Sequence, residues 1–108
     1  MFVLLPTYRA PLDEVDALLE KHRDWLDTHC AAGRFLLFGR REPRDGGFIL
    51  AADGDRRELE LIAASDPFST AGLVAYEVLE VRPTGGAPAV LQTLSAHGVA
   101  VSLPARGQ

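Results

Sequence analysis

The sequence predicts a single α+β domain, and three observations lead to this prediction. The chain has 108 residues, of which 47% are hydrophobic, so it can bury one core but is too short for two domains. Residues 12–32 repeat their apolar positions every three or four residues, as an amphipathic helix does. Short apolar runs bounded by Gly, Pro and Asp alternate with this helix and with a second helical pattern at residues 56–64.

The first half of the chain is typical of a strand, a helix and a hairpin. Residues 2–7 form a short apolar run that ends at a proline-containing break, which predicts a strand. The helix at residues 12–32 carries acidic side chains in its first turns, where the helix dipole favours them, and Gly33 caps its end. The Phe- and Leu-rich run 34–41 is too short for a helix. The Pro, Asp and Gly residues after it favour a hairpin to a strand at 48–52.

The second half adds a helix and a strand. Asp53-Gly54-Asp55 offers turn and N-cap chemistry for a helix at residues 56–64, which ends before Pro67, and residues 73–82 predict a fourth strand. The order is strand, helix, strand, strand, helix, strand. This is the split βαβ pattern of the ferredoxin-like fold, in which both helices cover one face of a four-stranded antiparallel sheet.

The residues after Pro83 do not belong to this pattern. We therefore predict a ferredoxin-like domain over residues 1–83 and a C-terminal extension over residues 84–108, packed on the domain or on its dimer partner. Within the extension, residues 90–97 favour a short helix and residues 99–103 a further strand.

The predicted sheet is apolar on both faces. In the last strand Val74, Tyr76 and Val78 share one face, whereas Leu73, Ala75, Leu79 and Val81 share the other. Strict alternation in the second strand likewise places Phe35 and Leu37 on one face and Leu36 and Phe38 on the other. Because the helices cover one face only, we expect a second copy of the chain on the other face, with the extension as the alternative cover.

Composition excludes several classes of partner. The formal net charge of −4 argues against nucleic acid, whose phosphates need a basic surface. The first residues lack the pattern of a leader segment and no apolar run approaches the roughly 18 residues of a membrane span, so we expect neither. Cys30 is the one cysteine, so no disulfide can form within the chain, and a reducing compartment such as the cytoplasm is expected.

The sharpest chemical signal is a histidine within the apolar stripe of the first helix. His22 lies on the core-facing side, whereas its neighbour Arg23 is expected on the solvent face. A buried imidazole needs hydrogen-bond partners, and Asp66, held out of the helical conformation by Pro67, is the candidate. A carboxylate on one ring nitrogen makes the other a proton acceptor. The alternative is a satisfied core histidine and an ordinary turn aspartate.

Other candidate residues carry weaker signals. His22 and His29 lie seven residues apart, about 10 Å along a helix, which is too far for one zinc ion, so we expect no metal and no cofactor. Arg44, the preferred one of three arginines around the hairpin, can hold an anionic substrate group, although such a cluster is often only a solvated loop. Ser69 can donate a hydrogen bond to substrate, or can simply cap a turn.

Several short motifs carry a family resemblance, and the cluster around Asp66 is the most specific of them. They are His22, Gly33-Arg34-Phe35-Leu36, Pro43-Arg44-Asp45-Gly46-Gly47, Asp66-Pro67-Phe68 and Ala71-Gly72-Leu73. With these motifs the sequence up to Pro83 resembles the YCII-related (YciI-like) proteins. The resemblance implies a dimeric α/β barrel, in which two ferredoxin-like subunits pack sheet to sheet. One departure is Gly39-Arg40, where many relatives have Gly-Pro.

The resemblance also implies a site built on a histidine and an aspartate, here His22 and Asp66. The characterised chemistry of the family is removal of chloride from a chlorinated hydroxyquinol. We therefore expect cofactor-free proton transfer or elimination on a small molecule, with aromatic rings among the candidates. His22 acts as general base or acid, Asp66 orients it, and Arg44 and Ser69 bind substrate. The alternative is a non-catalytic small-molecule-binding or structural homodimer.

Overall fold

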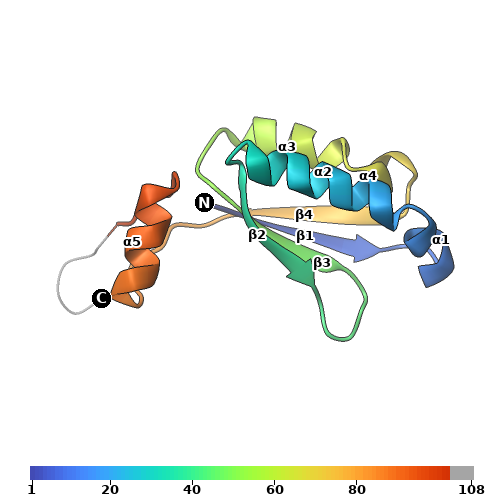
Figure 1. Cartoon of the computed structure of the whole chain (residues 1–108), viewed down its shortest axis with the longest axis horizontal. Coiled ribbons are helices and arrows are strands. Elements are labelled where there is room, and N and C mark those ends of the chain that lie inside the picture. The colour runs from blue at the N-terminus through green and yellow to red at the C-terminus, as the bar shows by residue number, and fades with distance from the viewer. Residues whose placement is uncertain (103–108) are drawn as a thin grey trace.

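The structure, a computed structural model, describes residues 1–102, and these residues form an α+β fold (Figure 1). The predicted order of strands and helices is confirmed, with additional short helices. In chain order the elements are β1 (Phe2–Tyr8), α1 (Leu12–Ala17), α2 (Leu19–Ala31), β2 (Phe35–Arg40), β3 (Gly47–Ala51), α3 (Arg56–Ala64), α4 (Pro67–Thr70), β4 (Val74–Glu80) and α5 (Pro88–Ala96).

The four strands form one antiparallel sheet in the order β2-β3-β1-β4. Strand β1 lies between two partners, and its Leu4 is opposite Ile49 of β3 and Val78 of β4. Figure 1 shows α2, α3 and α4 together on one side of this sheet. This arrangement confirms the ferredoxin-like α+β prediction.

The main core lies between the sheet and helices α2 and α3. The strands contribute their helix-facing positions, which alternate with outward-facing ones because successive strand residues point to opposite faces. The helices contribute the inner stripe of each amphipathic pattern. The buried members of this cluster are Phe2, Leu4, Leu26, Phe35, Ile49, Ala51, Leu59 and Ala63.

The first helical segment is not continuous as predicted. It is interrupted at Leu18, which has φ −109° and ψ 6° and separates α1 from α2. Val15 of α1 packs in a second buried cluster with Phe68 and Leu73, whereas Leu26 of α2 packs in the main core. The interruption thus allows the two halves of the amphipathic pattern to bury their apolar faces in different places.

Strand β2 departs from the strict alternation that the sequence suggested. Its pairing with β3 shifts register between Phe35 and Leu37, as in a β-bulge. Phe35 is buried, and Phe38 packs against the same core cluster, so both aromatic rings lie on the helix side. The prediction that they lie on opposite faces is wrong, because the bulge adds one residue to the alternation.

The face of the sheet opposite the helices is rich in apolar side chains. Leu37 is paired with Leu50, which is paired in turn with Val3, and Val3 alternates with the buried Phe2 and Leu4. Leu37 is 53% exposed. This surface, called here the open face, consists of Val3, Leu5, Leu37, Phe48, Leu50 and Leu79.

The C-terminal extension contains a helix, as predicted. The residues that follow this helix form hydrogen bonds with the domain. Figure 1 places α5 beyond the end of the sheet. The Asp53 N–H donates to the Gly98 carbonyl at 2.9 Å, and the Ala100 N–H donates to Asp53 Oδ2 at 2.8 Å. Val99 between them is buried. The domain boundary at Pro83 stays a prediction.

The strand predicted at residues 99–103 is wrong for its described part, residues 99–102. The Val99 N–H donates to the Leu94 carbonyl at the end of α5, and the Ser102 N–H donates to the Pro83 carbonyl. These two carbonyl groups occupy backbone donors that a strand ladder would need. Leu103 lies outside the described residues. Within residues 1–102, no helix has the length and apolar character that crossing a membrane requires.

Candidate functional site

The structure brings His22 and Asp66 together. His22 lies in the second turn of α2 and Asp66 in the loop between α3 and α4, and His22 Nδ1 is 2.8 Å from Asp66 Oδ1. The Asp66 side chain is fully buried, whereas that of His22 keeps 13% of its surface exposed. The histidine is therefore the member of the pair that a small molecule can reach.

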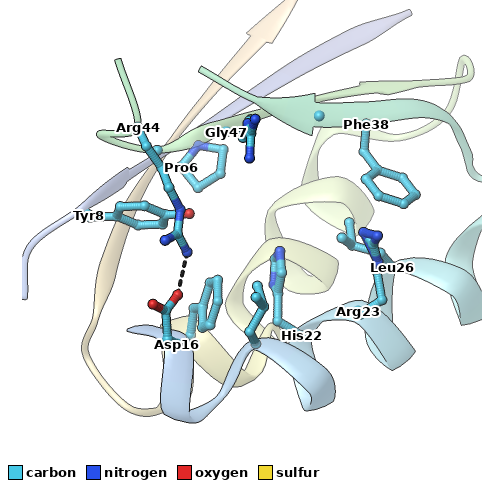
Figure 2. A pocket seen from close by; sticks show the side chains of 14 residues that line it. Pro6, Tyr8, Asp16, His22, Arg23, Leu26, Phe38, Arg44 and Gly47 are labelled. Carbon is cyan, nitrogen blue, oxygen red and sulfur yellow. Dashed lines mark hydrogen bonds and ion pairs between the residues drawn. The ribbon is translucent and has the colours of Figure 1, made fainter. Parts of the chain in front are cut away.

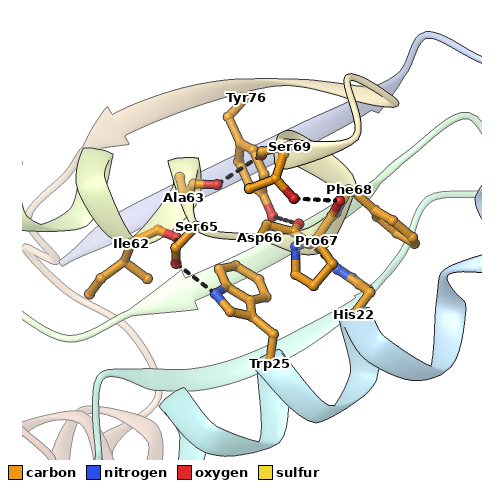
Figure 3. Close-up of polar contacts among 11 residues, drawn as sticks. His22, Trp25, Ile62, Ala63, Ser65, Asp66, Pro67, Phe68, Ser69 and Tyr76 are labelled. Atoms are coloured by element: carbon orange, nitrogen blue, oxygen red, sulfur yellow. Dashed lines mark hydrogen bonds and ion pairs between the residues drawn. The ribbon is translucent and has the colours of Figure 1, made fainter.

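Local backbone structure holds the Asp66 carboxylate in place. Asp66 is the N-cap of α4, whose first residue is Pro67, and its Oδ1 accepts from the Phe68 N–H at 2.9 Å. Its other oxygen, Oδ2, accepts from the Tyr76 hydroxyl at 2.6 Å (Figure 3). Burial, reinforced by the negative charge of Asp66, raises the pKa of Tyr76, so this phenol stays a donor. Three donors therefore converge on one buried carboxylate.

This arrangement selects one tautomer of a neutral His22 ring. An ionised carboxylate only accepts hydrogen bonds, so the ring proton lies on Nδ1, facing Asp66. Nε2 then carries the lone pair. A ring in this state can take a proton at Nε2, and the adjacent Asp66 carboxylate stabilises the imidazolium that forms.

Two aromatic rings fix the plane of the imidazole. The ring of Phe68 is stacked on His22 with centroids 4.0 Å apart and an interplanar angle of 10°. On α2 itself, the ring of Trp25 has its centroid 5.7 Å from that of His22. Trp25 is held in turn by a 3.0 Å hydrogen bond from its Nε1 to Ser65 Oγ. The imidazole can therefore neither tilt nor turn away from Asp66 without disturbing its neighbours.

His22 lines a cavity of about 750 Å³ between α2, β2 and the hairpin (Figure 2). Aromatic side chains from three different parts of the chain, Tyr8, Phe38 and Phe68, form much of its apolar wall. Arginines and one carboxylate, that of Asp16, lie among its polar lining residues. The volume suits a small molecule with a planar ring.

Arg44 lines this cavity, and its role in substrate binding stays a prediction. Its guanidinium donates to the Asp16 carboxylate and lies 5.8 Å from the centroid of the Tyr8 ring. The hydrogen bond from Arg44 lowers the pKa of Asp16. Arg40 also lines the cavity, whereas Arg41 binds Asp45 at 3.0 Å and is not among the lining residues.

Ser69 does not line the cavity that contains His22. Its hydroxyl donates to the Ala63 carbonyl at 2.8 Å, and it borders a separate hollow of about 210 Å³ together with Tyr76. The hydroxyl is therefore used to join α4 to α3. A substrate-binding role for Ser69 stays a prediction.

The structure also assigns positions that sequence reasoning missed. Arg23, expected on the solvent face of the helix, lines the cavity with its guanidinium carbon 5.6 Å from the centroid of the Phe38 ring. The helical pattern places its Cα at the border of the apolar stripe, and the long side chain reaches back over the apolar wall. Phe68 was visible only as part of a motif, and nothing in the spacing indicated that its ring stacks on His22.

His29 packs away from His22 and near the end of α2. Its ring contacts those of Trp25 and Phe35, with centroids 5.3 Å and 5.1 Å apart respectively. Burial lowers the pKa of His29, and the positive charge of Arg34 lowers it further. Within residues 1–102, no group of three or more His, Cys, Asp or Glu side chains is arranged to hold a metal ion.

Comparisons with known proteins agree with this fold. The model of the family described as YCII-related domain matches residues 1–83. A similar solved structure is 5-chloro-2-hydroxyhydroquinone dehydrochlorinase from Burkholderia phenoliruptrix in complex with 2,5-dihydroxybenzoquinone. It shares 20% sequence identity and a TM-score of 0.64, covering 77% of this chain and 95% of that chain. No curated protein matches the sequence. At this identity the structural likeness shows the fold.

Proposed function

The chain belongs to the YCII-related domain family, and we propose that it is a small-molecule enzyme in which His22 and Asp66 carry out cofactor-free proton transfer or elimination. One observation carries the proposal. His22 Nδ1 contacts the buried Asp66 carboxylate at 2.8 Å, while the same ring lines a cavity large enough for a substrate. A base with a fixed tautomer and an accessible second nitrogen is what such chemistry needs.

The proposed reaction begins with His22 Nε2 taking a proton from a carbon or hydroxyl group of the substrate. In an elimination from the keto tautomer of a hydroxylated ring, the electron pair of the broken C–H bond forms a C=C bond and the leaving group departs with its own bonding pair. The imidazolium then releases its proton to solvent. In a proton transfer, the imidazolium returns the proton at another atom. Asp66 keeps its contact with Nδ1 and stabilises the imidazolium.

The name of the structurally similar protein suggests where to look for substrates. That protein is a dehydrochlorinase of a chlorinated hydroxyquinol. In the present chain, Tyr8, Phe38 and Phe68 line the cavity, and such rings favour contact with a flat ring. Small hydroxylated or halogenated aromatic molecules are therefore the first candidates. Arg44 borders the cavity from the hairpin and is proposed to contact substrate there.

We further propose that two copies of the chain associate through the open face. Leu37, Leu50 and Val3 form a contiguous apolar row across β2, β3 and β1. A two-fold dimer buries such a row against itself and removes it from water. The compartment proposed for the protein is the cytoplasm, since Cys30 is its one cysteine.

An alternative is a non-catalytic small-molecule-binding or structural homodimer. Asp66 caps α4 and is fully buried, so the bond to His22 also fastens α2 to the loop before α4. In that case the pair stabilises the fold, and nothing is turned over in the cavity.

Halide release and solvent deuterium incorporation with halogenated dihydroxybenzenes test the proposed activity. The informative variant is His22→Asn, because the asparagine amide can donate to Asp66 from the position of Nδ1 while Nε2 is deleted. We expect turnover to be lost while the free energy of unfolding changes by only about 1 kcal/mol. Equal rates for wild type and His22→Asn would show that His22 is not the base.

A further inference from the structure

We propose that the cavity selects a small planar oxyanion, a carboxylate or an ionised phenol, and that Arg23 binds its charged group. This inference rests on the proposed function, because it concerns the substrate of the same cavity. It also names a binding residue that neither the motifs nor the helical pattern indicated.

The charges around the cavity do not cancel. Among the described residues that line it, three are arginines, Arg23, Arg40 and Arg44, and Asp16 is the only one with a carboxylate. Asp16 is bound by Arg44, and Arg40 is bound at 3.1 Å by Glu42, outside the cavity. Within residues 1–102, Arg23 has neither an ion pair nor a side-chain hydrogen bond. Its charge is therefore available to a ligand.

The position of Arg23 suits a ligand that also reaches His22. Arg23 and His22 are consecutive residues of α2, and Figure 2 shows both side chains extending from that helix into the same cavity. The guanidinium lies over the face of Phe38, which restrains it by a cation–π contact while leaving its N–H groups free to donate. An anionic ring can then lie along the aromatic wall with its charged end at Arg23.

The positive charge at this cavity contrasts with the charge of the rest of the molecule. The whole chain carries a formal net charge of −4, so positive charge at this cavity stands against an acidic background. Local charge of this kind attracts anions to one place on the surface. A guanidinium offers paired N–H groups in a plane, which match the two oxygens of a carboxylate. In the proposed reaction, the same group would stabilise negative charge that develops on the substrate when His22 takes a proton.

The test compares two probes of equal shape, benzoate and the neutral benzamide, by NMR titration of the full ¹⁵N-labelled chain. We expect benzoate to shift the amide signals of α2 and β2 and to bind at least about tenfold more tightly than benzamide. Arg23→Gln should weaken benzoate binding by about tenfold and leave benzamide unaffected, and Arg23→Lys should fall between wild type and Arg23→Gln. Arg57→Gln, which removes an exposed arginine of α3, is the matched control and should bind both probes as wild type does.

Two results would overturn the inference. One is benzoate binding no more tightly than benzamide to the wild type. The other is Arg23→Gln retaining the preference for benzoate. The His22→Asn variant separates this question from catalysis, because it should keep that preference. If Arg23→Gln loses benzoate while His22→Asn has wild-type turnover, the anion site stands and the proposed reaction fails.

Discussion

The imidazole of His22 lies flat against the ring of Phe68, with centroids 4.0 Å apart. The backbone N–H of the same phenylalanine donates to Asp66, which is the partner of His22. One residue thus fixes both the plane of the proposed base and the orientation of its acceptor. The short helix α4 that contains Phe68 is therefore part of the site and not only a connection between α3 and β4.

Asparagine and alanine at position 66 should have different consequences. His22 and Phe68 donate to the same atom, Oδ1, so an asparagine can keep its oxygen there and donate from its amide to the Tyr76 hydroxyl. We expect Asp66→Asn to lower the free energy of unfolding by less than about 1 kcal/mol and Asp66→Ala to lower it by about 1–3 kcal/mol. Urea unfolding of both variants measures this, and equal losses would contradict the shared-acceptor geometry.

Tyr76→Phe should make the fold less stable but leave the contact between His22 and Asp66 in place. The substitution deletes the donor to Asp66 Oδ2 and leaves the apolar ring in place. We expect the free energy of unfolding to fall by about 1 kcal/mol. Imidazole ¹⁵N chemical shifts should still report the Nδ1–H tautomer of His22, because its own partner, Oδ1, is untouched. A change of tautomer in this variant would show that Tyr76 orients the carboxylate.

His29 should make the fold less stable in mild acid. Burial and then Arg34 lower its pKa below the ordinary value of 6.5, so the unfolded chain takes up a proton at a higher pH than the folded chain does. The contribution is therefore fully present above that value and is lost as the pH falls below it. Urea unfolding between about pH 5 and pH 8 should show this decline, and His29→Gln should reduce it. A ring titration midpoint above 6.5 would contradict the argument.

A charge on the open face should separate the proposed dimer. Leu37→Asp places a carboxylate among Val3, Leu50 and their copies, where it would be desolvated without a partner. We expect wild type to sediment as a dimer and Leu37→Asp as a monomer. Leu61→Asp on α3 is the matched control, because Leu61 is 58% exposed and Leu37 is 53% exposed. A wild-type monomer, or dissociation of both variants alike, would contradict the proposed interface.

The contact between His22 and Asp66 could be predicted from the sequence, and three features of the sequence explain why. A helical stripe identifies which side of α2 faces the protein, and the alternating order of strands and helices places the end of α3 next to it. Pro67 then keeps Asp66 extended, so that its side chain caps α4. Each of these features can be recognised in the sequence, and each is present in the structure.

Three other features of the structure could not be predicted from the sequence. Residues 35–38 are apolar at every position, so alternation carries no information about register and the bulge could not be found. The interruption at Leu18 occurs without a proline or glycine, in the middle of a regular pattern. Arg23 was misplaced because a helical pattern describes the directions of Cβ atoms, whereas a long side chain reaches well beyond them.

Asp66 has consequences for anyone who wishes to transplant this site into another scaffold. The residue follows α3, caps α4 and holds His22 of α2 at once. A graft that copied only the histidine and the aspartate would lack helix α4, whose N-terminus orients the carboxylate. It would also lack the Phe68 ring, which stacks on the imidazole. The smallest portable version is thus two segments, α2 and the stretch from Ser65 to Tyr76, carried over with their relative placement intact.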